Sequence, residues 1–182
     1  MKEFKVPTRG DVSENNQVIF DNLKKALGMV PNLYATMAYS DTALSNYLQF
    51  QNSKTSFSNK EKEVVNLVVS QINGCQYCQA AHTAIAQMNG FKDNEIIQIR
   101  LGFSNWDSKI DALAKLTKAI TETKGTSVEE ELSDFYNAGY TNASLVDLIL
   151  LIADKIVMNY LHNIISVPID FPVAPELEME SL

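Results

Sequence analysis

Apolar residues recur along most of the chain at intervals of three and four positions, which is the period of an amphipathic α-helix. In the first such segment Val18, Phe20 and Leu23 lie roughly on one face, and Gly28 followed by Pro31 supplies a helix stop signal. No segment alternates apolar and polar residues between hairpin turns, as a half-buried strand would. The pattern therefore predicts an all-α protein, a bundle of about eight helices.

Start and stop signals give the expected helix boundaries. Ser58 with Glu61 and Ser127 with Glu130 have the spacing of capping boxes, in which the two side chains satisfy free backbone N–H groups at a helix start. The helical segments are expected at 14–27, 31–39, 41–53, 59–72, 75–89, 93–101, 108–124, 128–137 and 142–165. Together they predict a single domain that spans residues 1–182.

Both ends of the chain are predicted to be extended arms. After Ser166 three prolines fall within eight residues, which forbids a helix. One interpretation of this stretch is a frayed terminus. The other is an arm laid over a neighbouring subunit, because Ile169, Phe171 and Val173 would otherwise be exposed.

Length and charge limit the possible functions. A chain of 182 residues can bury a sizeable core. The net charge of −7, with 15 basic residues among 22 acidic ones, argues against a nucleic-acid partner. The most apolar stretch, 145–157, contains Asp147, Asp154 and Lys155 and is too short and too charged to span a membrane. The first ten residues lack an apolar signal segment, so a cytoplasmic, reducing compartment is expected.

Two cysteines and a histidine are the candidate chemistry. Cys75, Cys78 and His82 are spaced three and four residues apart, so their side chains share one helix face. The pair directly follows Gly74, and the partial positive charge of a helix N-terminus favours thiolate. In a reducing compartment such a pair is expected to cycle in redox chemistry or to bind metal.

Two other interpretations of the cysteines stay open at this point. They could be small apolar residues buried at a helix joint. Alternatively, Cys75, Cys78, His82 and His162 could hold a structural zinc ion, although three ligands on one helix are unusual for such a site.

A longer motif surrounds the cysteine pair. Glu63 is followed by eleven residues, then Cys-x-x-Cys, three residues and His82, with Asn73-Gly74 directly before the first cysteine. This pattern resembles the alkylhydroperoxidase D-like (AhpD-like) and carboxymuconolactone decarboxylase family. Further segments resemble its peroxidase-related branch, namely Val6-Pro7, Gly28-Met29-Val30-Pro31-Asn32 and Asp170-Phe171-Pro172. The resemblance implies an AhpD-like helical domain in which residues 58–90 form the redox-active helix pair.

The resemblance also implies an activity and a role for each residue. Cys78 would attack a small organic hydroperoxide or hydrogen peroxide, and Cys75 would resolve the resulting sulfenic acid to a disulfide. His82 and Glu63 would form a proton relay. An external dithiol would reduce the disulfide, with no bound cofactor or metal. The family further implies a homo-oligomer, either a trimer, a hexamer or a dimer. Two alternatives are a carboxymuconolactone decarboxylase and a non-enzymatic thiol redox sensor.

Two features of the motif carry structural conditions. Twelve residues of one continuous helix span about 18 Å, so Glu63 can join the site only if the chain bends at Asn73-Gly74. Tyr77 stands between the cysteines, where peroxidases of the family can carry a second histidine. Tyrosine is a poor base near neutral pH, so Tyr77 is at most an auxiliary residue and peroxide turnover is expected to be modest.

Overall fold

The computed structural model describes residues 4–177, and regular structure in this range consists of helices without strands. The expected all-α fold is therefore confirmed. The elements are the 3-10 helix η1 (Arg9–Asp11) and the α-helices α1 (Glu14–Leu27), α2 (Asn32–Met37), α3 (Ala43–Gln51), α4 (Asn59–Ile72), α5 (Gln76–Met88), α6 (Asp93–Leu101), α7 (Ser108–Thr123), α8 (Glu129–Asn137) and α9 (Asn142–Ile165).

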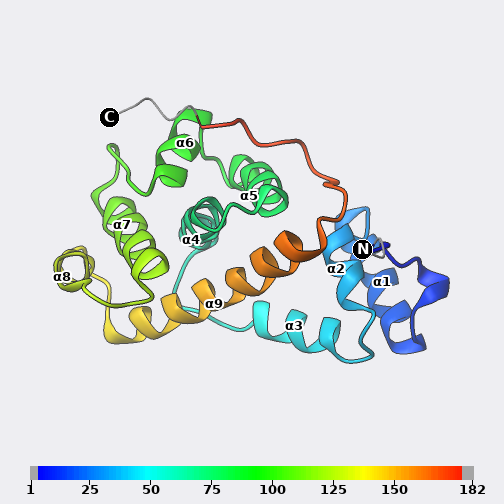
Figure 1. The fold of residues 1–182 in the computed structure, drawn as a ribbon. Coiled ribbons are helices and arrows are strands. Elements are labelled where there is room, and N and C mark those ends of the chain that lie inside the picture. The colour runs from blue at the N-terminus through cyan, green and yellow to red at the C-terminus, as the bar shows by residue number, and fades with distance from the viewer. Residues whose placement is uncertain (1–3, 178–182) are drawn as a thin grey trace.

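Helix α4 lies at the centre of the molecule, with α5, α6, α7 and α9 around it (Figure 1). Every residue from 63 to 70 is buried, so this helix is covered on all sides. Four of the five apolar residues in that run are valines, among them Val64 and Val68, and each is fully inaccessible. Burial of one such side chain contributes roughly 1.5–3 kcal/mol. The stability of the bundle thus centres on the helix that carries Glu63.

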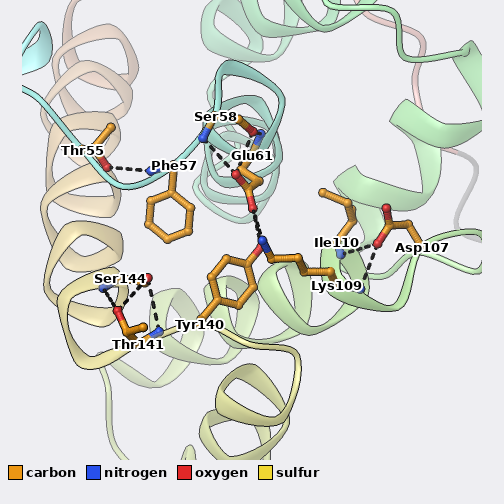
Figure 2. Close-up of polar contacts among 10 residues, drawn as sticks. All are labelled: Thr55, Phe57, Ser58, Glu61, Asp107, Lys109, Ile110, Tyr140, Thr141 and Ser144. Atoms are coloured by element: carbon orange, nitrogen blue, oxygen red, sulfur yellow. Dashed lines mark hydrogen bonds and ion pairs between the residues drawn. The ribbon is translucent and has the colours of Figure 1, made fainter.

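One carboxylate connects the starts of three helices (Figure 2). The predicted capping box of α4 is present, because Glu61 Oε2 accepts a hydrogen bond from Ser58 N at 2.9 Å and Ser58 Oγ accepts one from Glu61 N at 3.3 Å. The other oxygen, Oε1, accepts a hydrogen bond from the Tyr140 hydroxyl at 2.9 Å and lies 3.2 Å from Lys109 Nζ. Tyr140 directly precedes the α9 cap and Lys109 lies in α7, so Glu61 fixes α4 relative to both helices.

The second predicted capping box is wrong. Val128, and not Ser127, is the N-cap of α8, and its side chain makes no capping hydrogen bond. Ser127 has a φ of 56°, in the left-handed region. An N-cap residue normally has an extended backbone, so the conformation of Ser127 is incompatible with that role.

Helix α9 has its polar and apolar faces reversed with respect to solvent. Its C-terminal half buries four residues with polar or charged side chains, namely Asp154, Lys155, Asn159 and His162. Several of its large apolar side chains are 45–80% exposed, namely Val146, Ile149, Leu150, Val157, Tyr160 and Ile164. The buried polar face lies toward α4 and α5, so α9 presents polar groups to the region of the cysteines.

The C-terminal arm packs on its own chain. From the end of α9 it passes over α2 and α5 toward α6 (Figure 1). Ile169 and Phe171 pack against the apolar cluster that contains both cysteines. Farther along, Arg100 of α6 donates a hydrogen bond from Nη1 to the Pro175 carbonyl at 2.7 Å. Between 166 and 177 the arm is therefore neither frayed nor in need of a neighbouring subunit to cover Ile169 and Phe171. Val173 stays 79% exposed.

None of the helices within residues 4–177 is both long enough and apolar enough to cross a membrane.

Candidate functional site

The site begins at the joint between α4 and α5. Asn73 caps the C-terminus of α4, and Gly74 has a φ of 64°, a conformation that glycine adopts at little cost. The chain bends there, as the motif requires, and α5 packs back along α4. As a result Glu63 Oε2 of α4 lies 2.8 Å from Nδ1 of His82 of α5.

The two thiols occupy different positions at the start of α5. Cys75 is the N-cap residue, and its sulfur accepts a hydrogen bond from Cys78 N at 3.3 Å. Cys78 lies in the first turn, near the positive end of the helix dipole. Both are free thiols, and their exposed fractions are 0% and 3%.

Their environment also separates the acidities of the two sulfurs. A hydrogen bond from the Cys75 thiol lowers the pKa of Cys78, the positive charge of Lys155 and polar contact with Asn159 lower it further, and burial opposes the shift. Donation of that hydrogen bond to Cys78 and burial both raise the pKa of Cys75. Cys78 is therefore the sulfur that ionises, while Cys75 keeps its proton.

Glu63 and His82 form a buried hydrogen-bonded pair. Burial raises the pKa of Glu63, but the charge and hydrogen bond of His82, the charge of Lys155 and a 3.0 Å hydrogen bond from Asn66 Nδ2 outweigh it, so the net pKa is lowered. Burial and the nearby Lys155 charge lower the pKa of His82. An ionised Glu63 accepts from Nδ1–H of a neutral His82, which leaves Nε2 with a free lone pair. His82 thus has the form of a general base.

These two shifts predict a loss of stability in acid. Both groups have a folded pKa below their unfolded value, which for histidine is 6.5. The unfolded chain therefore takes up more protons as the pH falls, and stability declines below about pH 6.5. We expect urea unfolding to give a lower free energy of unfolding at pH 5 than at pH 7.5. His82→Gln should flatten that dependence, and an unchanged pH slope in this variant would contradict the assignment.

A cavity of about 270 Å³ opens beside Cys78 and His82. Its lining is mostly apolar, and it comprises Leu27, Met29, Pro31, Leu33, Tyr34, Gln51, Tyr77, Cys78, Ala81, His82, Ile85, Met88, Lys155, Met158 and Phe171. Helices α1, α2, α3, α5 and α9 and the C-terminal arm all contribute. The cavity gives a small apolar molecule access to Cys78 and His82 together.

Several residues at this site had no predicted role. In the sequence, Lys155 and Asp154 count only as charges that interrupt an apolar run, yet both are buried, and Lys155 lines the cavity. Asn159 likewise had no assigned role, and its side chain donates to Ser70 Oγ at 3.3 Å and accepts from Asn73 Nδ2 at 3.0 Å. The signal that could have found them is the four-residue spacing of Lys155 and Asn159 on an otherwise apolar helix.

Tyr77 has a structural position. Its hydroxyl donates to Asp170 Oδ1 at 2.6 Å and accepts from Leu33 N at 3.3 Å. Its ring meets Phe171 edge-on, with centroids 5.6 Å apart. Asp170 also accepts a hydrogen bond from Asn32 N through Oδ2 at 2.7 Å. Tyr77 therefore joins α5, the start of α2 and the C-terminal arm around the cavity, which argues against a part in proton relay.

The Tyr77→Phe variant should be destabilised and should release the arm. The change removes the acceptor of Leu33 N, a buried donor whose loss of a partner costs about 1–3 kcal/mol. We expect a lower free energy of unfolding in urea and faster proteolysis between 168 and 175. Unchanged proteolysis of the arm would show that the apolar contacts alone hold it.

His162 does not complete a zinc site. Its Nε2 lies 3.1 Å from the Val167 carbonyl oxygen, and its ring packs against Tyr77. Among the residues that the structure describes, no group of three or more His, Cys, Asp or Glu side chains is arranged to hold a metal ion. The four ligands that the zinc interpretation needs are therefore not brought together.

Part of the chain is similar to a known protein family. Residues 40–120 match the carboxymuconolactone decarboxylase family. No match is found among curated protein sequences. The fold is similar to that of the alkylhydroperoxidase AhpD core of an uncharacterized peroxidase-related protein from Ralstonia eutropha JMP134, with 17% identity, 92% of each chain covered and a TM-score of 0.82.

Two further solved proteins have similar folds. An uncharacterized peroxidase-related protein from Silicibacter sp. TM1040 has 18% identity and a TM-score of 0.77, with 91% of this chain and 88% of that chain covered. The debrominase Bmp8 has 16% identity and a TM-score of 0.76, with 93% of each chain covered. At these identities the likeness concerns the fold. The chain thus has the AhpD-like fold, and its residues 40–120 match the carboxymuconolactone decarboxylase family.

Proposed function

We propose that the protein is a thiol-dependent hydroperoxide reductase that cycles through a Cys75–Cys78 disulfide. The observation that carries the proposal is the unequal pair of buried thiols beside a cavity that also exposes His82. The ionised sulfur of Cys78 attacks the terminal oxygen of the hydroperoxide, the O–O bond breaks, and the alkoxide leaves as an alcohol after it takes a proton. Cys78 is then a sulfenic acid.

Resolution needs one more proton movement. The Cys75 sulfur attacks the sulfenic sulfur as its own proton is removed, the S–S bond forms, and hydroxide leaves as water. In this proposal Nε2 of His82 takes and returns these protons, and the hydrogen bond between Nδ1 and Glu63 supports that role. An external dithiol then reduces the disulfide, so the cycle needs no resident metal or organic cofactor.

The apolar lining favours organic hydroperoxides over hydrogen peroxide as substrates. The test is steady-state consumption of cumene hydroperoxide and of hydrogen peroxide with dithiothreitol as the donor. We expect a higher kcat/KM for cumene hydroperoxide and recovery of the disulfide form when the donor is omitted. Absence of dithiol-dependent consumption of either peroxide would refute the proposal.

Reductive dehalogenation is a second candidate. A variant of the debrominase Bmp8 with a cysteine replaced by alanine has been solved in complex with 2,3,4-tribromopyrrole, and it shares this fold with a TM-score of 0.75. The apolar cavity beside a thiol pair could accept a small halogenated ring, with two thiols oxidised to a disulfide as bromide leaves and a proton replaces it. Release of bromide from 2,3,4-tribromopyrrole in the presence of dithiothreitol would support this candidate.

The cavity fits the two remaining alternatives less well. A decarboxylase substrate of the carboxymuconolactone type carries carboxylates, whereas the cavity offers one lysine within a mainly apolar lining, and Asp154 lies next to that lysine. A redox sensor would need no substrate cavity beside the thiols. A disulfide that forms with peroxide but supports no turnover would favour the sensor.

We also propose that the chain forms a homo-oligomer through the outer face of α9. The exposed Val146, Leu150, Val157 and Ile164 follow one another at spacings of four and seven residues along that face. Val157→Glu should dissociate the oligomer, because it places a charge in an apolar contact. Light scattering after size-exclusion chromatography measures the effect, with Val173→Glu on the arm as the control. A monomeric wild-type protein would contradict the prediction.

A further inference from the structure

Lys155 is a buried cation that has one carboxylate neighbour, Asp154, and no hydrogen-bond acceptor among the described residues. The residue is 2% exposed, and it lines the cavity together with Cys78 and His82. Its Nζ lies 3.8 Å from Asp154 Oδ2, which is too long for a hydrogen bond. Burial of a charge is costly unless the charge is paired and hydrogen-bonded. Within the described part of the chain, this lysine therefore reduces stability unless another negative charge forms beside it.

The surrounding carboxylates leave that charge incompletely balanced. Glu63 of α4 is held by hydrogen bonds from His82 of α5 and Asn66 of α4. Asp154 of α9 has one buried oxygen, Oδ1, without a hydrogen-bond partner in the structure. The negative charge of Asp154 also acts on the hydroxyls of Tyr34 (α2) and Tyr47 (α3), and burial raises the pKa of both, so they stay neutral.

Cys78 is the remaining group of α5 that faces this arrangement and can become an anion. We propose that Lys155 is the counter-charge of the Cys78 thiolate and that Asp154 opposes it, so that the two neighbouring residues of α9 set the reactivity of the sulfur. Both act as positioning residues, since they work through Cys78. The inference rests on the proposed function only for the identity of the reacting sulfur.

The geometry of α9 supports this assignment. Lys155 and Asn159 are one turn apart on its buried face, and Asn159 is anchored by Ser70 and Asn73 of α4. The helix thus brings the Lys155 charge to the cavity that Cys78 lines, and its Asn159 amide acts on both cysteines. The charge effects on Cys78 have opposite signs, since Lys155 lowers its pKa and Asp154 raises it. Substitutions at adjacent residues should therefore change the same rate in opposite directions.

The experiment measures alkylation of Cys78 by iodoacetamide in the reduced protein, as a function of pH, with mass analysis to assign the modified cysteine. No peroxide is used. Lys155→Met should raise the midpoint by about one pH unit, a roughly tenfold slower reaction below the midpoint. Asp154→Asn should lower the midpoint and accelerate the reaction. Lys155→Arg should restore most of the wild-type rate.

Two controls accompany this experiment. Lys115→Met removes an exposed lysine of α7 and should leave the midpoint unchanged. Thermal unfolding of each variant reports folding, and if Lys155→Met fails to fold, the Asp154→Asn and Lys155→Arg variants still provide the test. Equal midpoints in wild type and Lys155→Met, or shifts of the same sign for Lys155→Met and Asp154→Asn, would overturn the inference. Shifts of opposite sign without peroxide turnover would uphold it and refute the proposed function.

Discussion

Cys78→Ser should abolish dithiol-dependent peroxide reduction. Cys78 is the sulfur whose pKa is lowered by the Cys75 hydrogen bond and the Lys155 charge, and it lines the cavity that a hydroperoxide would enter. A serine hydroxyl stays protonated near pH 7 and cannot replace a thiolate as nucleophile. Loss of the nucleophile should lower kcat/KM by at least about 10³-fold, measured as peroxide consumption with excess dithiothreitol.

Cys75→Ser should separate the two chemical steps. The first attack needs only Cys78, so one equivalent of peroxide should still be consumed, and mass analysis should find one added oxygen atom on Cys78. Without an external thiol the reaction should stop there, because no second thiol of the chain is available to form the disulfide. A stable sulfenic acid on Cys75 in the Cys78→Ser protein would instead reverse the assigned order. Full activity in both variants would show that neither cysteine takes part in the reaction.

The fold could be predicted because its boundaries have strong local signals. Gly28 ends α1 in a left-handed conformation, and the Ser58 box begins α4 at the expected residue. The failure at Ser127 has a local cause that composition does not reveal. The motif Ser-x-x-Glu is present there, but the backbone of Ser127 has a positive φ and cannot cap the helix.

Only those residues of the candidate site that lie close to one another in the sequence could be predicted. Cys75, Cys78 and His82 share one helix, and the glycine before them predicts the bend that brings in Glu63. Lys155 comes from a helix about eighty positions away in the chain, and an apolar pattern cannot tell which face of α9 turns inward. Because its apolar face is exposed, the usual rule would have placed Lys155 in solvent. The Tyr77 hydroxyl likewise meets Asp170 only through the fold.

Glu63→Gln should lower peroxide turnover and shift its dependence on pH. The ionised carboxylate fixes Nδ1–H of His82, which directs the lone pair of Nε2 toward the reaction. A neutral amide cannot stabilise the imidazolium that forms when His82 takes a proton, so kcat should fall by about 10²-fold or more. Because Glu63 Oε2 lies only 2.8 Å from His82 Nδ1, we expect the effect of Glu63→Gln on turnover to be large.

The pH profile distinguishes a relay from a structural role. Burial and Lys155 lower the pKa of His82, while the Glu63 charge and hydrogen bond raise it. Removal of that negative charge should therefore lower the His82 pKa further. If activity needs neutral His82, the acidic limb of the pH profile of kcat should move to lower pH in Glu63→Gln, while the plateau of that profile falls. Glu61→Gln is the matched control on the same helix, because Glu61 ties helix starts together away from the cavity. The Glu61→Gln variant should be less stable, and the acidic limb of its pH profile should not move. If Glu63→Gln lowers the plateau without shifting the acidic limb, the role of Glu63 is limited to holding α4 against α5.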